Sequence, residues 1–270
     1  MKKLSIVTAY YNRKELFIRT LKTINNSKYA SDIEIIVVDD GSREEERLED
    51  LIGTFNFDFK VIRLNPEDKW YYNPSVPFNI GIRAATGKLT MLQNPECLHV
   101  GDLVSTAIEN IKDNDYFSFG CYSLTEDVTD RFGTINFDSD KWLEKINLCL
   151  TPIKQGPVEC DGCDGWYNHS RFRPVAYHFC SVIPTKHIQE MGGFDERYAK
   201  GIAFDDNEIL LRIRRKGLVV NVVDSPFVVH QHHYSEFNWA GVTNTQELLD
   251  KNKKLFNDVT LKETGWKIVN

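Results

Sequence analysis

The chain has 270 residues, of which 41% are hydrophobic and 27% are charged, and its formal net charge is −6. This composition is ordinary for a soluble globular protein, and the length allows one large domain or two small ones. The negative balance provides no global basic field for nucleic acid, and no apolar run approaches the ~20 residues that span a bilayer. Polar residues follow Lys2 and Lys3 too soon for a signal peptide, so we expect a cytoplasmic protein.

Short apolar runs alternate with amphipathic segments in the first quarter of the chain. The spacing predicts strands at 4–9, 35–38 and 60–64 and helices at 15–26 and 43–51, the second with Ser42 as its N-cap. The run Ile35-Ile36-Val37-Val38 is apolar throughout, as in a parallel strand that is buried on both faces. This alternation predicts a mostly parallel, right-handed α/β sheet.

The later segments extend the pattern, except for a long stretch without clear periodicity. Further strands are predicted at 88–92, 116–119, 178–184 and 218–223, extended chain at 227–230, and helices at 78–85, 100–111, 185–191, 209–216 and 244–255. Between 125 and 173 the periodicity fades, although the aromatic residues there favour an ordered, functional loop region. No Gly/Ser-rich linker separates the parts, which indicates one domain with two lobes.

The six cysteines are expected to be free thiols, because disulfides are rare in the cytoplasm. Cys160-x-x-Cys163 has the spacing of half a zinc site, but no second Cys-x-x-Cys pair follows it. Ordinary thiols are therefore the preferred interpretation of this pair.

Polar residues gather where several predicted strands end. Asp39 and Asp40 follow the second strand, Tyr10-Tyr11-Asn12-Arg13 follow the first, and Gln93-Asn94-Pro95-Glu96 follow the fourth. Open α/β sheets bind ligands outside the carboxyl ends of their strands, so these residues are placed to hold a ligand. The alternative for the two aspartates is that they are solvated acids that end a strand.

Five segments, taken in order, resemble the family-2 glycosyltransferases over roughly residues 4–235. They are Tyr10-Tyr11-Asn12-Arg13, Val37-Val38-Asp39-Asp40-Gly41-Ser42, Asn79-Ile80-Gly81 with Ala85-x-Gly87, Gly192-Gly193-Phe194-Asp195-Glu196-Arg197-Tyr198 and Asp205-Asp206-Asn207-Glu208. The resemblance implies a glycosyltransferase-A fold, a mostly parallel Rossmann-like sheet flanked by helices with an acceptor-side lobe. It further implies a single domain over 1–240, with a nucleotide-binding half at 1–120 and an acceptor half at 121–240, before a helical tail at 241–270.

Enzymes of this family transfer a sugar from a nucleotide donor to an acceptor hydroxyl, usually with Mn²⁺ or Mg²⁺ and with inversion at the anomeric carbon. The resemblance implies a UDP-sugar donor and a pocket formed by Thr8, Tyr10, Arg13, Asp39, Asp40, Asn79, Arg83, Gln93 and Asn94. It also implies that Asp206 is the catalytic base, with Asp205 as the fallback. The alternative is that both acids only cap the helix that follows them.

The sequence departs from the family where Asp-x-Asp usually holds the metal, since Gln93-Asn94-Pro95-Glu96 stands there. Glu96 is the one anionic residue of this segment, and His230 and His232, on one side of an extended chain, are expected to join it as metal ligands. A site without metal is the alternative, in which Arg83 and Lys88 would stabilise the leaving diphosphate.

Trp166, Tyr167 and His169, together with Trp70-Tyr71-Tyr72, are expected to stack on a carbohydrate or glycoconjugate acceptor; core packing is the alternative. The Gln-x-x-Arg-Trp motif and the membrane spans of processive relatives are absent, which favours a non-processive hexosyltransferase, with peripheral membrane contact left open. A catalytically degenerate nucleotide- or glycan-binding member is the main alternative. A dinucleotide-dependent oxidoreductase would need glycines after the first strand, and a nucleotidyltransferase a glycine- and lysine-rich loop there; neither is present.

Overall fold

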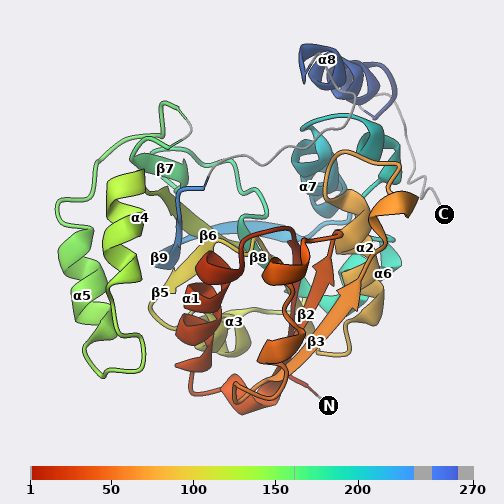
Figure 1. The fold of residues 1–270 in the computed structure, drawn as a ribbon. Coiled ribbons are helices and arrows are strands. Elements are labelled where there is room, and N and C mark those ends of the chain that lie inside the picture. The colour runs from red at the N-terminus through yellow and green to blue at the C-terminus, as the bar shows by residue number, and fades with distance from the viewer. Residues whose placement is uncertain (1, 161, 234–244, 261–270) are drawn as a thin grey trace.

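A computed structural model describes residues 2–160, 162–233 and 245–260 (Figure 1). Its strands are β1 Leu4–Tyr10, β2 Ile33–Asp39, β3 Asp58–Arg63, β4 Leu89–Gln93, β5 Cys97–Val100, β6 Asp115–Ser123, β7 Gly165–Asn168, β8 Cys180–Pro184 and β9 Val219–His230. Its α-helices are α1 Lys14–Asn25, α2 Ser75–Ala84, α3 Leu103–Asn110, α4 Glu126–Gly133, α5 Trp142–Cys149, α6 Thr185–Glu190, α7 Asp205–Arg215 and α8 Thr245–Leu255. Short 3₁₀ turns are η1 Ala30–Asp32, η2 Glu44–Glu46, η3 Glu49–Leu51, η4 Pro66–Asp68 and η5 Glu196–Lys200, and Phe256–Thr260 forms a π-helical turn, η6.

The strands form one mixed sheet in the order β3-β2-β1-β4-β8-β6-β9-β5, and β7 pairs with β6 outside this order. The pairs β3–β2, β2–β1, β1–β4 and β6–β9 are parallel, whereas β8 runs antiparallel to both of its neighbours. The predicted mostly parallel α/β sheet is confirmed. Because β1 lies between β2 and β4, the strand order reverses beside it, which is where open α/β sheets hold their ligands.

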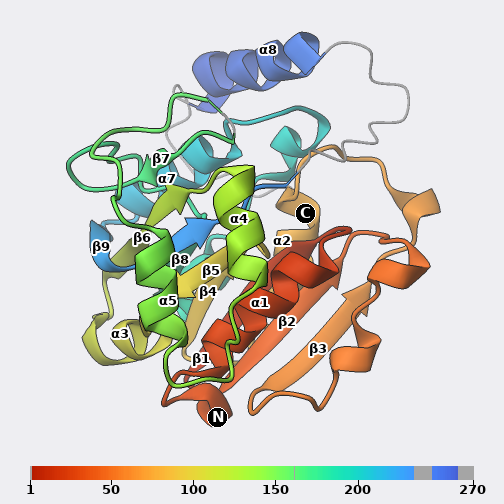
Figure 2. The same ribbon diagram turned by 60° about the vertical axis from the view of Figure 1, so that its left-hand side comes forward.

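Helices cover both faces of the sheet (Figures 1 and 2). Phe17, Leu21 and Ile24 of α1 are buried against one face, together with α3, because their spacing forms one apolar stripe along the helix. The opposite face is covered by α2, α6 and α7. A third apolar cluster, which includes Phe132 of α4 and Ile146 of α5, packs around β5 and β7. β1 and β4 are therefore packed between the first two apolar clusters.

Three element predictions differ from the structure. The predicted helix 43–51 is two separate turns, η2 and η3, because Arg47 between them is extended. Ser42 caps no helix, since its Oγ accepts a hydrogen bond from the backbone N–H of Asn12. The predicted helix 100–111 begins only at Leu103, because residues 97–100 form strand β5. The described residues of the 125–173 stretch form α4, α5 and β7, in agreement with the order that its aromatic residues indicated.

The expectation of free thiols is wrong for one pair of cysteines. Cys160 and Cys163 are joined by a disulfide, whose Cα atoms are 5.4 Å apart, within the usual range for such bonds. Cys97, Cys121, Cys149 and Cys180 are free, as predicted.

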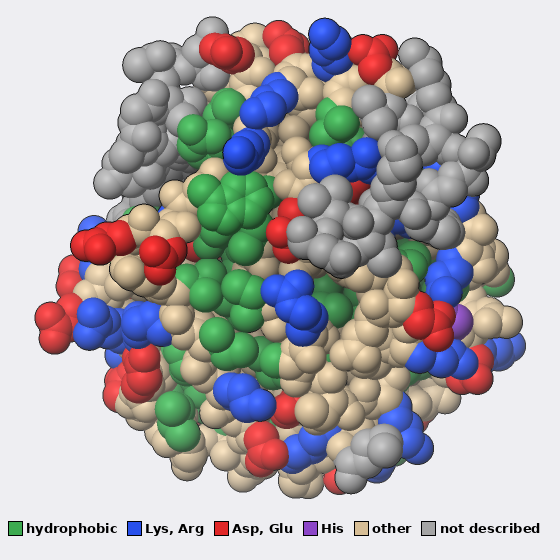
Figure 3. All heavy atoms as spheres, turned by 90° about the vertical axis from the view of Figure 1, so that its right-hand side faces the viewer, with side chains coloured by type: hydrophobic (Ala, Val, Ile, Leu, Met, Phe, Trp, Pro, Cys, Tyr) green, Lys and Arg blue, Asp and Glu red, His purple; other side chains and the backbone are tan. Residues whose placement is uncertain are grey.

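The surface bears no dominant field of one sign in the view of Figure 3, where basic and acidic side chains are interspersed among apolar ones. Across the described ranges, no helix has the length and apolar character needed to cross a membrane. The predicted tail helix is confirmed as α8, whereas the boundaries of the two halves and of the tail stay predictions.

Candidate functional site

The loop after β1 is shaped by a buried tyrosine. Tyr10 is completely buried, and its hydroxyl donates a 2.7 Å hydrogen bond to the backbone carbonyl of Glu46 and accepts one from the backbone N–H of Arg13. Burial raises the pKa of Tyr10 far above its ordinary value. Thr8 is also buried in β1, at 1% exposure. We therefore assign Tyr10 and Thr8 to the scaffold beneath the site, in place of the nucleotide contacts that the sequence predicts.

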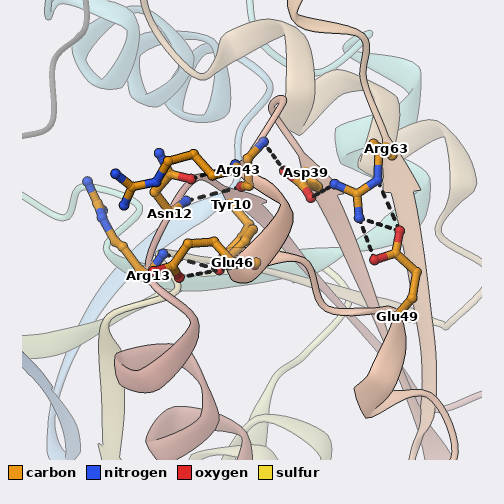
Figure 4. A network of polar contacts seen from close by, with 9 residues as sticks. Tyr10, Asn12, Arg13, Asp39, Arg43, Glu46, Glu49 and Arg63 are labelled. Atoms are coloured by element: carbon orange, nitrogen blue, oxygen red, sulfur yellow. Dashed lines mark hydrogen bonds and ion pairs between the residues drawn. The ribbon is translucent and has the colours of Figure 1, made fainter.

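A hydrogen-bonded network joins the carboxyl ends of β1 and β2 (Figure 4). Asp39 accepts a 2.8 Å hydrogen bond from the backbone N–H of Ser42, and its other oxygen lies 2.5 Å from Nη1 of Arg63. Asn12 links the two loops, because its N–H donates to Ser42 and its side-chain oxygen accepts from the N–H of Arg43. Asp39 itself is fully buried and paired, so its carboxylate holds the loop in shape.

The neighbouring carboxylate faces a different group of side chains. Asp40 accepts a 2.5 Å hydrogen bond from the hydroxyl of Tyr71 and pairs with Nζ of Lys69 at 2.6 Å. Burial and the adjacent carboxylate raise the pKa of the Tyr71 hydroxyl, which stays neutral and donates. The Lys69 ammonium lies 5.4 Å from the ring centroids of both Tyr11 and Tyr71. Two tyrosine rings, an ammonium group and a carboxylate therefore lie together directly after β2.

Glu96, in the turn between β4 and β5, is the centre of a second cluster. Its side chain is buried, yet Arg13 Nη1 lies 2.7 Å from Oε2, and Nε2 of His230 and of His233 lie 3.1 and 3.7 Å from Oε1. Burial alone would raise the pKa of Glu96, but Arg13 and the two histidines outweigh it and hold that pKa well below its usual range. Glu96 is therefore a carboxylate that faces three nitrogen groups.

The histidine pair differs from the predicted one. Oxygen and nitrogen atoms of Glu96, His230 and His233 lie within 4.8 Å of one another, and this is the single cluster of its kind in the described part of the chain. His232 is outside it, and its backbone N–H donates to Thr129. The prediction assumed that strand alternation continues, but β9 ends at His230, so the side chain that returns to Glu96 belongs to His233.

A shallow cavity of about 240 Å³ opens beside this cluster. It is lined by Tyr11, Asn12, Arg13, Lys14, Glu15, Leu16, Glu46 and His233. The cavity thus connects the Glu96 cluster with the loop after β1.

Two side-chain amides that were predicted to bind nucleotide make hydrogen bonds within the protein instead. The side-chain oxygen of Asn79 accepts a hydrogen bond from the backbone N–H of Phe194 at 2.7 Å. Its amide nitrogen donates to the carbonyl of Phe194 at 2.9 Å and to the carboxylate of Glu196 at 3.0 Å. Gln93 is buried, donates to the carbonyl of Cys97 and contacts the ring of His99. We assign both residues to structural roles.

Three further polar residues that were predicted to contact the donor, Asn94, Arg83 and Lys88, lie in different parts of the structure. Asn94 is half-buried between β4 and Glu96, and its N–H donates to the carbonyl of Phe179. Arg83 is exposed near the end of α2. Lys88 immediately precedes β4, at the opposite end of that strand from Glu96, a position that does not favour the alternative leaving-group role.

Asp205 and Asp206 begin α7, and a histidine faces them. His178 is 7% exposed, and its Nδ1 lies 2.5 Å from Oδ1 of Asp206. Burial opposes the charge of the ring, but the Asp206 carboxylate outweighs this effect and the pKa of His178 is raised. Asp205 is buried, and desolvation together with Asp206 raises its pKa to about 6. The two acids therefore differ, since Asp206 is paired and partly exposed while Asp205 is enclosed.

The backbone before these acids is strained. Ala203 and Phe204 both have left-handed backbone angles, with φ of 58° and 66°, which non-glycine residues seldom adopt. Such outliers persist only where the surrounding structure determines them, and they concentrate at functional sites. The helix N-terminus also favours negative charge at Asp206.

The aromatic residues predicted to bind acceptor are divided between core and site. Trp166 is buried among Tyr122 and Phe227, so it belongs to the third core. His169 lies against Trp166, with ring centroids 4.5 Å apart. Tyr167 stacks on Phe179 and packs against His230, which brings it next to the Glu96 cluster. Trp70 and Tyr72 are 48% and 38% exposed.

Comparisons with known proteins agree on one family. The sequence model described as glycosyl transferase family 2 matches residues 5–166. Over 267 residues the chain is 22% identical to an uncharacterized glycosyltransferase, YfnE, of Bacillus subtilis, a match that covers 86% of this chain and 66% of that protein. It is 25% identical to a chondroitin synthase of Escherichia coli, over 94% of this chain and 39% of that protein. The chain thus spans less than two thirds of these relatives' lengths.

Solved structures of glycosyltransferases share the fold. S. aureus TarS in complex with UDP-GlcNAc superimposes with a TM-score of 0.62 at 12% identity, over 92% of this chain and 64% of that one. A mannosyltransferase from Pyrobaculum calidifontis, in complex with GDP-Man and Mn²⁺, gives 0.53 at 13% identity, over 87% and 58%. The predicted glycosyltransferase-A fold is confirmed.

Proposed function

The chain belongs to glycosyl transferase family 2. On that premise we propose that it is a non-processive, inverting glycosyltransferase, which moves a hexosyl group from a UDP-sugar to a hydroxyl of a carbohydrate or glycoconjugate. The observation that carries the proposal is the grouping of Arg13, Glu96, His230 and His233 at the sheet position where such folds hold their donors.

The donor nucleotide is proposed to bind across the ends of β1 and β2. Asp40, Tyr71 and Tyr11 supply a carboxylate, a hydroxyl and an aromatic face, which suit the hydrogen-bonding edges of a ribose and a base. Asp39 and Asn12 keep this loop in position through Ser42. Arg13 lines the cavity and pairs with Glu96, so it is the proposed cationic contact of the diphosphate. Asn94 and Arg83 stay predicted donor contacts.

A divalent cation fits the Glu96 cluster by the chemistry of its donors. One ionised carboxylate and two imidazoles form a mixed oxygen and nitrogen set, which suits Mn²⁺ better than Mg²⁺, since Mg²⁺ prefers oxygen ligands. We propose that Glu96, His230 and His233 hold Mn²⁺. When bound there, such a cation would neutralise charge on the leaving diphosphate.

Asp206 is the proposed base. Its Oδ1 pairs with His178, its side chain is 28% exposed, and none of the hydrogen bonds or ion pairs among the described residues involves its Oδ2. That oxygen is free to accept the proton of the attacking acceptor hydroxyl, an effect worth about 10²–10⁴ in rate. Asp205 is enclosed at 8% exposure, which supports its rank as the fallback.

The acceptor is proposed to lie against the second half of the chain. Tyr167 is the strongest candidate for stacking, because it contacts His230 while remaining partly exposed. His169 is a second candidate, whereas the burial of Trp166 leaves it a supporting role. The nucleotide half at 1–120 and acceptor half at 121–240 follow this division of roles.

Donor hydrolysis and transfer with Mn²⁺ test the proposal directly. We expect UDP-sugar to be hydrolysed slowly, and Asp206→Asn to lower the rate of transfer about 10²–10⁴-fold while nucleotide still binds. Nucleotide binding without any turnover by the parent would instead identify a degenerate, nucleotide-binding member of the family. Wild-type turnover by Asp206→Asn would remove the base assignment.

A further inference from the structure

His178 was not among the sequence-predicted site residues, yet it contacts the proposed base twice. Its Nδ1 lies 2.5 Å from Oδ1 of Asp206, and its backbone N–H donates to the same oxygen at 3.2 Å. The side-chain contact has the distance of an ion pair, although the ring N–H is not aligned for a hydrogen bond, and it is attractive when Nδ1 carries a proton because two facing lone pairs would repel. One oxygen of Asp206 is therefore held from both the ring and the main chain of His178.

The ring of His178 is itself held in place. It meets Phe78 edge-on, at 5.2 Å between centroids and an interplanar angle of 90°, and Phe194 at 4.8 Å and 62°. This aromatic slot fixes the plane of the imidazole. The charged groups that face it are Asp206 and Asp205, and both raise the pKa of the ring against the effect of burial.

We propose that His178 is a positioning residue for Asp206, which fixes Oδ1 so that Oδ2 is presented to the acceptor hydroxyl. The inference rests on the proposed function, since it assigns His178 a role through the base. A misplacement of about 1 Å in a reacting group reduces the rate about 10²-fold, so the loss of this contact must lower kcat. Donor binding at the ends of β1 and β2 should not change, because His178 lies before β8.

Two substitutions separate positioning from packing. His178→Asn loses most of the ring but places an amide N–H near the position of Nδ1, whereas His178→Phe fills the aromatic slot and provides no donor. Positioning predicts that the Asn variant keeps kcat within roughly 5-fold of the parent and that the Phe variant loses about 10²-fold at unchanged KM for the donor. If the ring of His178 only fills space, the Phe variant should keep the parent's kcat and the Asn variant should lose it.

The experiment measures kcat, donor KM and thermal unfolding for both variants, with His178→Gln as a third, since its amide lies near Nε2 and should behave like Phe. His187→Asn and His187→Phe are the matched controls, because the ring of His187, in α6, lies 2.8 Å from the carbonyl of Asp113 and 4.0 Å from Glu190 and belongs to neither proposed site. Both should keep the parent's kcat. In an Asp206→Asn background, His178→Phe should cause no further loss.

The outcomes distinguish this inference from the proposed function. If Asp206→Asn is inactive while His178→Phe has the parent's kcat, the positioning role is overturned and the base assignment stands. An Asn variant as slow as the Phe variant, both folded, also overturns it. Full activity of Asp206→Asn overturns both.

Discussion

The guanidinium of Arg13 lies 2.7 Å from the buried carboxylate of Glu96, although the two residues are 83 positions apart in the sequence. Arg13 follows β1 and Glu96 follows β4, so the ion pair links the two strand ends that flank the reversal of strand order. The other oxygen of Glu96 faces two histidines. One buried anion thus contacts three cationic or metal-ligating groups from two distant parts of the chain.

Glu96→Gln is expected to reduce activity and Mn²⁺ binding together. The substitution keeps the volume and removes the charge that Arg13, His230 and His233 share, so transfer should fall roughly 100-fold or more. The thermal stabilisation by excess Mn²⁺, about 2.7 kcal/mol at 100 times Kd in the parent, should disappear. Glu190→Gln, an exposed glutamate paired with Lys216, is the matched control and should retain both. Undiminished stabilisation by Mn²⁺ in Glu96→Gln would contradict the metal assignment.

The two histidines after β9 are expected to differ in their effect on Mn²⁺. His233→Ala removes an imidazole of the Glu96 cluster and should raise the Kd for Mn²⁺ roughly 100-fold, whereas His232→Ala, outside the cluster, should change it less than about 3-fold. Electron paramagnetic resonance of free Mn²⁺ measures both constants. A larger effect of His232→Ala would restore the pair that strand alternation predicts.

The sequence predicted the sheet well because its signals are local. Apolar runs such as Ile35–Val38 and helical stripes such as that of α1 depend on neighbours within a few residues, and both are found where expected. The helix predicted at 43–51 failed because tertiary contacts compete with local propensity. Glu46 accepts a hydrogen bond from the backbone N–H of Lys14, and Glu49 pairs with Arg63. These contacts with other elements favour two short turns over one continuous helix.

The site was predicted only in part, because burial and partners decide what a polar residue does. Glu96 and His230 were identified from their positions at strand ends, but the sequence could not show that Arg63 neutralises Asp39 or that Tyr71 donates to Asp40. His178 carried one available signal, a histidine at the first position of a predicted strand. Its partner is 28 residues later, a distance that no local pattern reports.

Asn79→Ala is expected to lower stability rather than donor affinity. The amide of Asn79 satisfies both backbone groups of Phe194, and each buried group left without a partner costs about 1–3 kcal/mol. We expect a loss of roughly 2–4 kcal/mol in urea unfolding at an unchanged m-value, with UDP binding intact. The exposed Asn110→Ala should lie within about 0.5 kcal/mol of the parent. Normal stability with weakened UDP binding would return Asn79 to the nucleotide pocket.

The enclosed acid at the start of α7 makes stability depend on pH. Desolvation and the neighbouring Asp206 raise the pKa of Asp205 from 3.8 to about 6. Between about pH 4 and pH 6 the folded protein therefore binds a proton that the unfolded chain releases. Stability from this group is complete below pH 4 and is lost as the pH rises through 6.

Asp205→Asn, which mimics the protonated acid, should consequently match the parent at pH 4 and exceed it at pH 7.5. The gain is up to roughly 3 kcal/mol, from about 2 pKa units at 1.36 kcal/mol each. Urea unfolding at several pH values between 4 and 8 measures this difference directly. Asp113→Asn, at a carboxylate that is 89% exposed, should show no such growth with pH. A difference between Asp205→Asn and the parent that is constant from pH 4 to pH 8 would mean that Asp205 ionises normally in the folded protein.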